Sequence, residues 1–219
     1  FDQSSVLLGM VAWYEASKDR EVLRRMEGLV DGLTRIAQWE GDWCRYPYEV
    51  ITPEGWTGEY DEFRNGRPMS PADPCHEGGR QIVGLTRVYE LTGYEPALWL
   101  AEGLTRFVID HSGVFEEDGS YLERESRARG HVHSRLGTAL GVLRLGIVKK
   151  DAEWVAWAKR VFDWSMQNVA SSFGWVSEQA HGPEGGSETC AITDALEIAI
   201  TLAEQGKQEY WNLADRIVR

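Results

Sequence analysis

A glycine-rich stretch late in the chain, residues 174–190, holds the densest group of side chains that could do chemistry. Glu178 and Glu184 are carboxylates that could transfer a proton. Glu188 and Cys190 stand two residues apart, and side chains at that spacing point the same way in an extended segment. A carboxylate and a thiolate suit zinc, although a structural zinc takes about four ligands. The same two residues also fit a structural role, in which Glu188 favours the positive end of a following helix and Cys190 packs in the core.

Two further segments place histidine at the start of a predicted helix. His76 lies four residues before Arg80, and the two share one helix face if the helix starts early; His131 lies four residues before Arg135, so that this pair could face one cleft. His131 and His133 would diverge by roughly 200° on a helix, so we do not expect them to bind one metal ion together. Such an Arg/His group in an acidic chain fits contact with a substrate carboxylate, and it equally fits solvated surface charge.

Tryptophan is abundant, with ten residues in the chain. Four of them fall in predicted loops: Trp39, Trp43, Trp56 and Trp175. A flat ring in a loop can pack on the C–H face of a sugar, while carboxylates accept from its hydroxyls. Tryptophan also covers the edges of a core, and the six others fit that role because they follow helical periodicity. The loop rings, Trp175 among them, therefore suggest a carbohydrate-binding cleft.

The elements that must position these residues are helices, because apolar residues recur at helical spacing and hardly ever alternate. The predicted helices cover residues 4–17, 20–38, 77–92, 95–111, 131–147, 151–169, 189–204 and 207–218. Asp19 and Asp151 precede helix starts, and Gly93 follows a helix end, as capping residues do. The links within successive helix pairs are short, whereas those between pairs (39–76, 112–130 and 170–188) are long. This alternation predicts an array of helical hairpins.

An internal repeat supports that array. Ala101, Ala158 and Ala214 each follow a tryptophan in the second helix of a hairpin, at spacings of 57 and 56 residues. We therefore predict an all-α fold, an (α/α) toroid whose long loops gather on one rim; a plain helical bundle is the alternative. Four hairpins do not close a ring of six. We accordingly expect residues 1–219 to be a single toroid domain and an incomplete segment of an (α/α)6 barrel.

Net charge, the length of apolar runs and the number of cysteines indicate which partners and which cellular compartment to expect. The formal net charge is −12, which opposes binding to nucleic acid or to an anionic membrane. No apolar run approaches the ~20 residues of a membrane helix. Three cysteines do not make a disulfide framework, so we expect a reduced, cytoplasmic protein.

The motifs at the hairpin starts resemble the bacterial β-L-arabinofuranosidase family of six-hairpin glycosidases. The resemblance covers about residues 75–219 and rests on four short motifs in the family's order: His76-Glu77, the helix end at 88–93, Gly130-His131 and Glu188-Thr189-Cys190. The last of these is the most specific.

The resemblance implies a retaining glycosidase with a zinc site in which Glu188 and Cys190 are two of the ligands. It further implies that a later Cys-Cys pair supplies two more ligands, one of them the nucleophile. Zinc is therefore expected only if cysteines beyond Arg219 complete the site. Glu178 is the expected acid/base, because it lies in the loop where the family keeps its acid, and Glu184 is the reserve. His76, His131, Arg135 and Trp175 are the expected substrate-binding residues.

Two other functions remain open on the same toroid. One is an epimerase or unsaturated-uronate hydrolase that uses His131 or His76 as base and Arg135 to hold a carboxylate. The other is a carbohydrate-binding domain without catalysis. The fold does not choose between them.

Overall fold

The structure, a computed structural model, describes residues 2–48, 51–52, 55–56, 72–121, 130–180 and 186–219. Its α-helices are α1 (Asp2–Ser17), α2 (Arg20–Ile36), α3 (Gln81–Thr92), α4 (Glu95–Arg106), α5 (Val132–Lys149), α6 (Ala152–Asn168), α7 (Thr189–Glu204) and α8 (Glu209–Val218). All eight predicted helices are present. Two of them carry a π-helical turn that the periodicity did not indicate: η2 (Pro74–Gly79) leads into α3, and η3 (Phe107–His111) ends α4.

The segment between α2 and η2, predicted as a loop, contains two short antiparallel pairs. Strand β1 (Gln38–Glu40) pairs with β2 (Trp43–Arg45), and β3 (Ile51–Thr52) pairs with β4 (Gly55–Trp56). They are too short to show the alternation that predicts strands.

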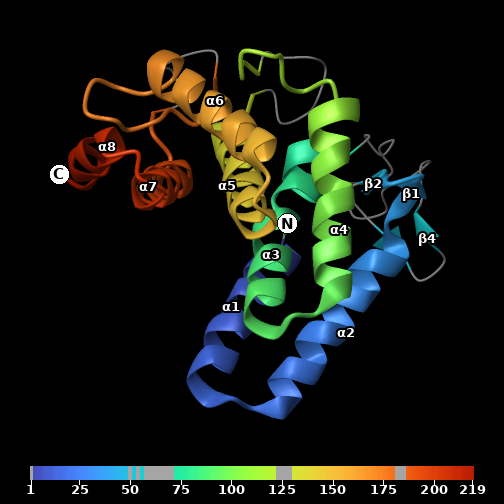
Figure 1. The fold of residues 1–219 in the computed structure, drawn as a ribbon. Helices are drawn as coiled ribbons and strands as arrows, with labels where there is room; N and C mark the ends of the chain where they lie inside the picture. The colour runs from blue at the N-terminus through green and yellow to red at the C-terminus, as the bar shows by residue number, and fades with distance from the viewer. Residues whose placement is uncertain (1, 49–50, 53–54, 57–71, 122–129, 181–185) are drawn as a thin grey trace.

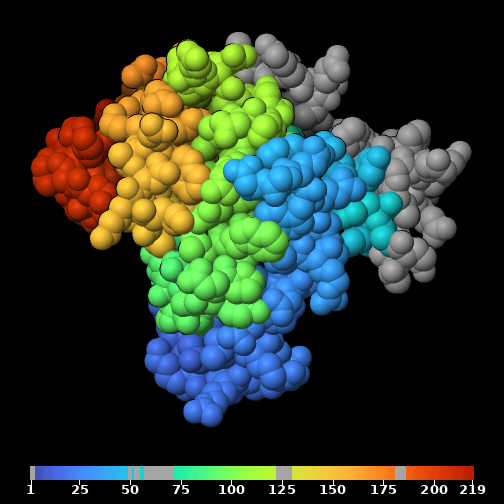
Figure 2. All heavy atoms as spheres, turned by 45° about the vertical axis from the view of Figure 1, so that its right-hand side comes forward, coloured from blue at the N-terminus to red at the C-terminus, as the bar shows by residue number. Residues whose placement is uncertain are grey.

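The helices form two layers of an arc. The inner helices follow one another side by side, since α3 packs against α1 and α5, and α5 packs against α7. Each inner helix pairs with the next helix in the chain, which lies on the outside. The α1–α2 and α3–α4 links lie toward the bottom of Figure 1, and the described residues 112–121 and 170–180 lie toward the top. In Figure 2 the outer helices α2, α4 and α6 form a continuous surface, with the red α7–α8 hairpin at its edge. The all-α hairpin toroid is confirmed.

The caps that delimit these helices are those the sequence indicated. The Asp19 side chain accepts from the backbone N–H of Glu21 at the start of α2, and Asp151 accepts from Glu153 and Trp154 at the start of α6. Gly93 ends α3 with φ of 70°, a left-handed conformation that glycine adopts without strain. The three repeated alanines, Ala101, Ala158 and Ala214, are all buried in outer helices.

Helix α5 is the centre of the core, with buried residues on all its sides from Val132 to Leu143. Small residues let its neighbours approach closely. A methyl group at Gly79 would lie 2.1 Å from Thr138 Oγ1, and one at Gly141 would lie 2.8 Å from Ile82 Cβ. The start of α3 is thereby held against the first turns of α5, where the candidate site lies.

All three cysteines, Cys44, Cys75 and Cys190, are free thiols, as expected. In the described residues no helix is both long enough and apolar enough to cross a membrane.

We predict that Gly141→Ala destabilises the protein by about 1–3 kcal/mol, because the added methyl overpacks the α3–α5 contact. Gly28→Ala is the matched control, since a methyl there meets nothing within 4 Å. Removing the flexibility of a glycine inside a helix should make Gly28→Ala stabilising by about 0.5–1 kcal/mol. Urea unfolding of both variants measures the two effects, and a Gly141→Ala variant as stable as the wild type would contradict this account of the packing.

Candidate functional site

Three histidines meet where the inner helices α3 and α5 begin. The ring centroids of His76 and His131 are 6.4 Å apart, and those of His131 and His133 are 5.8 Å apart. Glu188 lies at the start of α7, and its Oε2 is 3.0 Å from His131 Nε2, within hydrogen-bond distance. His76, His131 and Glu188, which stand at the starts of three different helices, therefore lie together. We call His76, His131 and His133, with their partners Glu77, Glu188 and Asp194, the histidine cluster.

His131 is the N-cap of α5 and lies outside the helix, with φ of −57° and ψ of 107°. The prediction that His131 and His133 diverge by a helical angle was therefore wrong, because it assumed that α5 already includes His131. Both ring nitrogens of His131 are engaged, Nδ1 with Ser134 Oγ at 2.9 Å and Nε2 with Glu188. This fixes the orientation of the ring.

Burial lowers the pKa of His131 below its usual value, and the Glu188 carboxylate opposes that effect. For Glu188, burial raises the pKa, but the hydrogen bond with Cys190 and the interaction with His131 outweigh burial and lower it overall. At neutral pH the pair therefore consists of a neutral imidazole and a carboxylate. A neutral imidazole is the form that can accept a proton.

His133 and Asp194 form a second pair, which the sequence reasoning missed. His133 Nδ1 lies 2.6 Å from Asp194 Oδ2, which joins α5 to α7. Burial raises the pKa of Asp194, while His133 and Arg80 act to lower it. With Asp194 holding Nδ1–H, the lone pair is on Nε2. The signal that could have found Asp194 is its place one helical turn after Cys190.

His76 and Glu77 form the third pair, with His76 Nδ1 2.7 Å from Glu77 Oε1. The His76 side chain is 32% exposed, against 18% for His131 and 11% for His133. It is therefore the histidine that a ligand from solvent would meet first.

Arg135 was expected to contact a substrate carboxylate beside His131, and its position does not fit that role. Its side chain is 4% exposed, and Nη1 and Nη2 donate to the two oxygens of Asp73 at 2.7 and 3.0 Å. The partner was not visible in the sequence, because Asp73 lies 62 residues away. Arg135 holds the start of η2 against α5.

A zinc site needs about four ligands, and the described residues do not supply them. Among them no three or more His, Cys, Asp or Glu side chains are arranged to hold a metal ion. Glu188 and Cys190 are neighbours, but burial and the Glu188 carboxylate raise the pKa of the Cys190 thiol to about 11. A protonated thiol and one carboxylate do not make a tetrahedral site. Zinc stays a prediction that depends on further cysteines.

The other candidates from the 174–190 stretch do not join the histidines through their side chains. The Glu178 carbonyl accepts from the N–H of Val132 at 2.9 Å, which places its backbone beside the start of α5. Its carboxylate contacts the Gln179 amide at 3.4 Å. The Trp175 indole N–H donates to the carbonyl of Ile217 in α8 at 3.0 Å, and its ring packs on Phe173. Glu184 lies outside the described residues.

Comparisons with known proteins bear on the fold. No family model matches the sequence, and no curated protein matches it significantly. The fold matches 23 chains of solved structures. One is a cellobiose 2-epimerase from Bacillus thermoamylovorans B4167, with a TM-score of 0.54 and 14% sequence identity; the match covers 93% of this chain and 60% of that one. That enzyme is an (α/α)6 toroid, so this chain shares the toroid fold and spans 60% of the neighbour's length. The resemblance to arabinofuranosidases stays a prediction.

We predict that Arg135→Met destabilises the protein by about 3–5 kcal/mol, because it leaves the Asp73 carboxylate buried without its partner. Adding Asp73→Asn should recover most of the loss, since the amide removes the charge and still accepts from the N–H groups of Cys75 and His76. Urea unfolding of the single and double variants measures this. Equal stability of Arg135→Met and the wild type would mean that the pair does not hold η2.

We also predict that Glu188→Gln lowers the pKa of His131 further, because the carboxylate it removes raises that pKa. Glu197→Gln is the matched control on the same helix, since Glu197 pairs with Arg144 instead. Glu197→Gln should leave the pKa of His131 unchanged. Proton NMR of the imidazole signals follows both, and an unchanged or raised pKa of His131 in Glu188→Gln would exclude the contact with Glu188.

Proposed function

We propose that this chain belongs to an enzyme that acts on a carbohydrate, and that its histidine cluster transfers protons at a carbon of the sugar. The observation that carries the proposal is the group of three neighbouring imidazoles, each hydrogen-bonded to its own carboxylate where the inner helices begin: His76 with Glu77, His131 with Glu188 and His133 with Asp194. The likeness of fold to a cellobiose 2-epimerase supports a sugar as the substrate.

Inversion at a carbon next to an aldehyde needs a base on one face and an acid on the other. The base breaks the C–H bond, the electron pair moves into an enediolate, and a proton returns from the opposite face. In this proposal His133 is the base, with Asp194 accepting its Nδ1–H so that Nε2 carries the lone pair. His76, the most exposed histidine of the cluster, returns the proton, and Glu77 orients its ring.

The main alternative is a retaining glycoside hydrolase of the arabinofuranosidase kind, with Glu178 as acid/base. It is favoured by the position of Glu178 beside the start of α5 and by its half-buried carboxylate. It also needs a nucleophile. The resemblance supplies that nucleophile from a later Cys-Cys pair and not from Cys190. An unsaturated-uronate hydrolase is weaker still, because Arg135, its expected carboxylate contact, is bound to Asp73.

The test is hydrogen exchange at the sugar carbon. Incubated with cellobiose in D2O, the full-length wild-type protein should place deuterium at C2, as mass spectrometry and NMR detect. His133→Gln should reduce the rate by about 10²–10⁴-fold, the usual contribution of a general base. Asp194→Asn should reduce it less. His111→Gln is the control, because His111 stacks on Trp43 outside the cluster.

The outcome that contradicts the proposal is also specific. If no deuterium enters, and if release of the leaving group from an aryl arabinofuranoside is lost in Glu178→Gln, the protein is a hydrolase. Sugar binding without either reaction would identify a carbohydrate-binding domain.

A further inference from the structure

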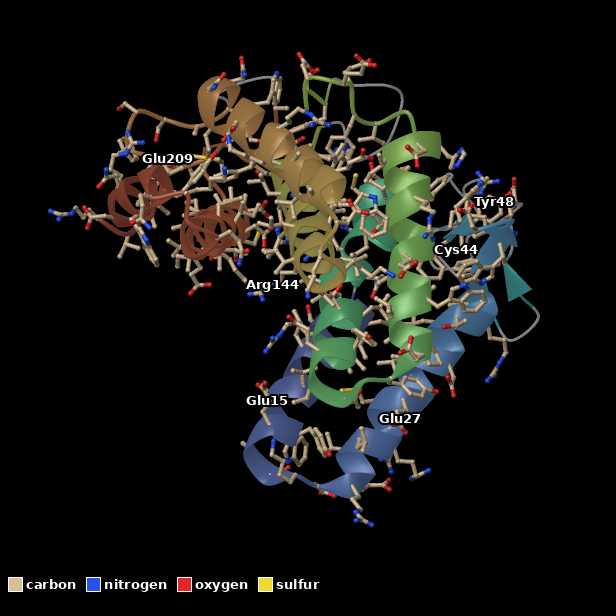
Figure 3. All side chains as sticks on the ribbon, viewed as in Figure 1. Glu15, Glu27, Cys44, Tyr48, Arg144 and Glu209 are labelled. Atoms are coloured by element: carbon tan, nitrogen blue, oxygen red, sulfur yellow. The ribbon has the colours of Figure 1, made fainter. Side chains whose placement is uncertain are left out.

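A second pocket lies beside the histidine cluster, between the end of α2, the short strands and the start of α3. It is a half-open hollow with about 400 Å³ of space, part of which is open solvent. Its walls include Ile36, Tyr46, Tyr48 and Trp56, and its polar lining includes Glu77 and Gln81. Figure 3 shows Tyr48 beside the short strands, well separated from α7 and α8.

The aromatic walls are held in place by α2. The Trp56 indole N–H donates to the carbonyl of Ile36 at 2.6 Å, and the Tyr46 hydroxyl donates to the carbonyl of Leu33 at 3.4 Å. The rings of Tyr46 and Trp56 are 6.0 Å apart and tilted by 44°. Because their polar atoms are already bonded, these residues offer a ligand their ring surfaces.

Two side-chain oxygens of the lining residues have no hydrogen-bond partner within the described residues. Gln81 is 2% exposed, and its Oε1 is buried without a hydrogen-bond partner there. Glu77 Oε2 is also buried without a hydrogen-bond partner, whereas Glu77 Oε1 bonds His76. A buried oxygen without a donor costs free energy, so a built site with two such acceptors calls for a ligand that supplies hydroxyl or amine hydrogens.

The chemistry of this lining fits a neutral sugar ring. A pyranose presents apolar C–H faces to aromatic rings and hydroxyl donors at its edge. Glu77 and the net charge of −12 disfavour an anionic sugar.

We propose that this pocket binds a second, neutral sugar unit, so that the substrate is a disaccharide or longer. The inference rests on the proposed function, since it places the reacting unit at the histidine cluster. Glu77 connects the two sites, since its Oε1 bonds His76 and the same residue lines the pocket.

Equilibrium binding of cellobiose and of glucose to the full-length protein, measured by calorimetry, tests the proposal. The wild type should bind cellobiose at least tenfold more tightly than glucose. Gln81→Met keeps the length of the side chain and removes the acceptor, so the ratio of the two affinities should fall about tenfold. Gln167→Met, on the exposed face of α6, is the matched control and should leave the ratio unchanged.

Tyr48→Ala provides a second variant in case Gln81→Met fails to fold, because Tyr48 is only half-buried. It removes part of the aromatic wall and should lower the same ratio. The proposal is overturned if the wild type binds both sugars equally, or if neither variant changes the ratio. Deuterium exchange at C2 is a separate readout: exchange that persists with equal binding rejects the pocket alone, whereas preferential cellobiose binding without exchange rejects the proposed reaction.

Discussion

The buried ion pair between Asp73 and Arg135 sets the positions on which the candidate site depends. Asp73 Oδ1 accepts from the N–H groups of Cys75 and His76 as well as from Arg135, and Oδ2 accepts from the second guanidinium nitrogen. One carboxylate therefore fixes the start of η2 and attaches it to α5. Because breaking such a pair leaves a buried charge, the contact fixes the register of the two helices strongly. His76 and His131 lie close together as a consequence.

Close packing of α3 against α5 adds to the effect of the ion pair on the positions of the histidines. Glycine at positions 79 and 141 leaves room for Thr138 and Ile82, so that α3 and α5 come within the distance at which their histidines interact. From α7, the carboxylates of Glu188 and Asp194 reach the two histidines of α5. Three inner helices thus contribute to one cluster, which no single hairpin could form.

The sequence predicted the helices and the convergence of their starts better than it predicted the role of each side chain. Caps such as Asp19 and Asp151 act within a few residues, so local sequence was enough to place them. The burial of Arg135 depends on a partner from another hairpin, and local spacing does not contain it. His131 precedes α5 with a non-helical backbone, so helix geometry did not give its relation to His133, and Asp194, the partner of His133, lies 61 residues away in another hairpin.

Burial leaves a neutral imidazole and a protonated thiol at the candidate site. It lowers the pKa of His131 and, with Glu188, raises the pKa of Cys190 to about 11, so at neutral pH the His131 ring between Ser134 and Glu188 is uncharged and the Cys190 thiol keeps its proton. The carboxylates orient the rings and stabilise the charge that a histidine gains on accepting a proton. Glu77 extends this arrangement, since its Oε1 bonds His76 Nδ1 and the same residue lines the aromatic pocket, so that one side chain links the histidines to the neighbouring hollow.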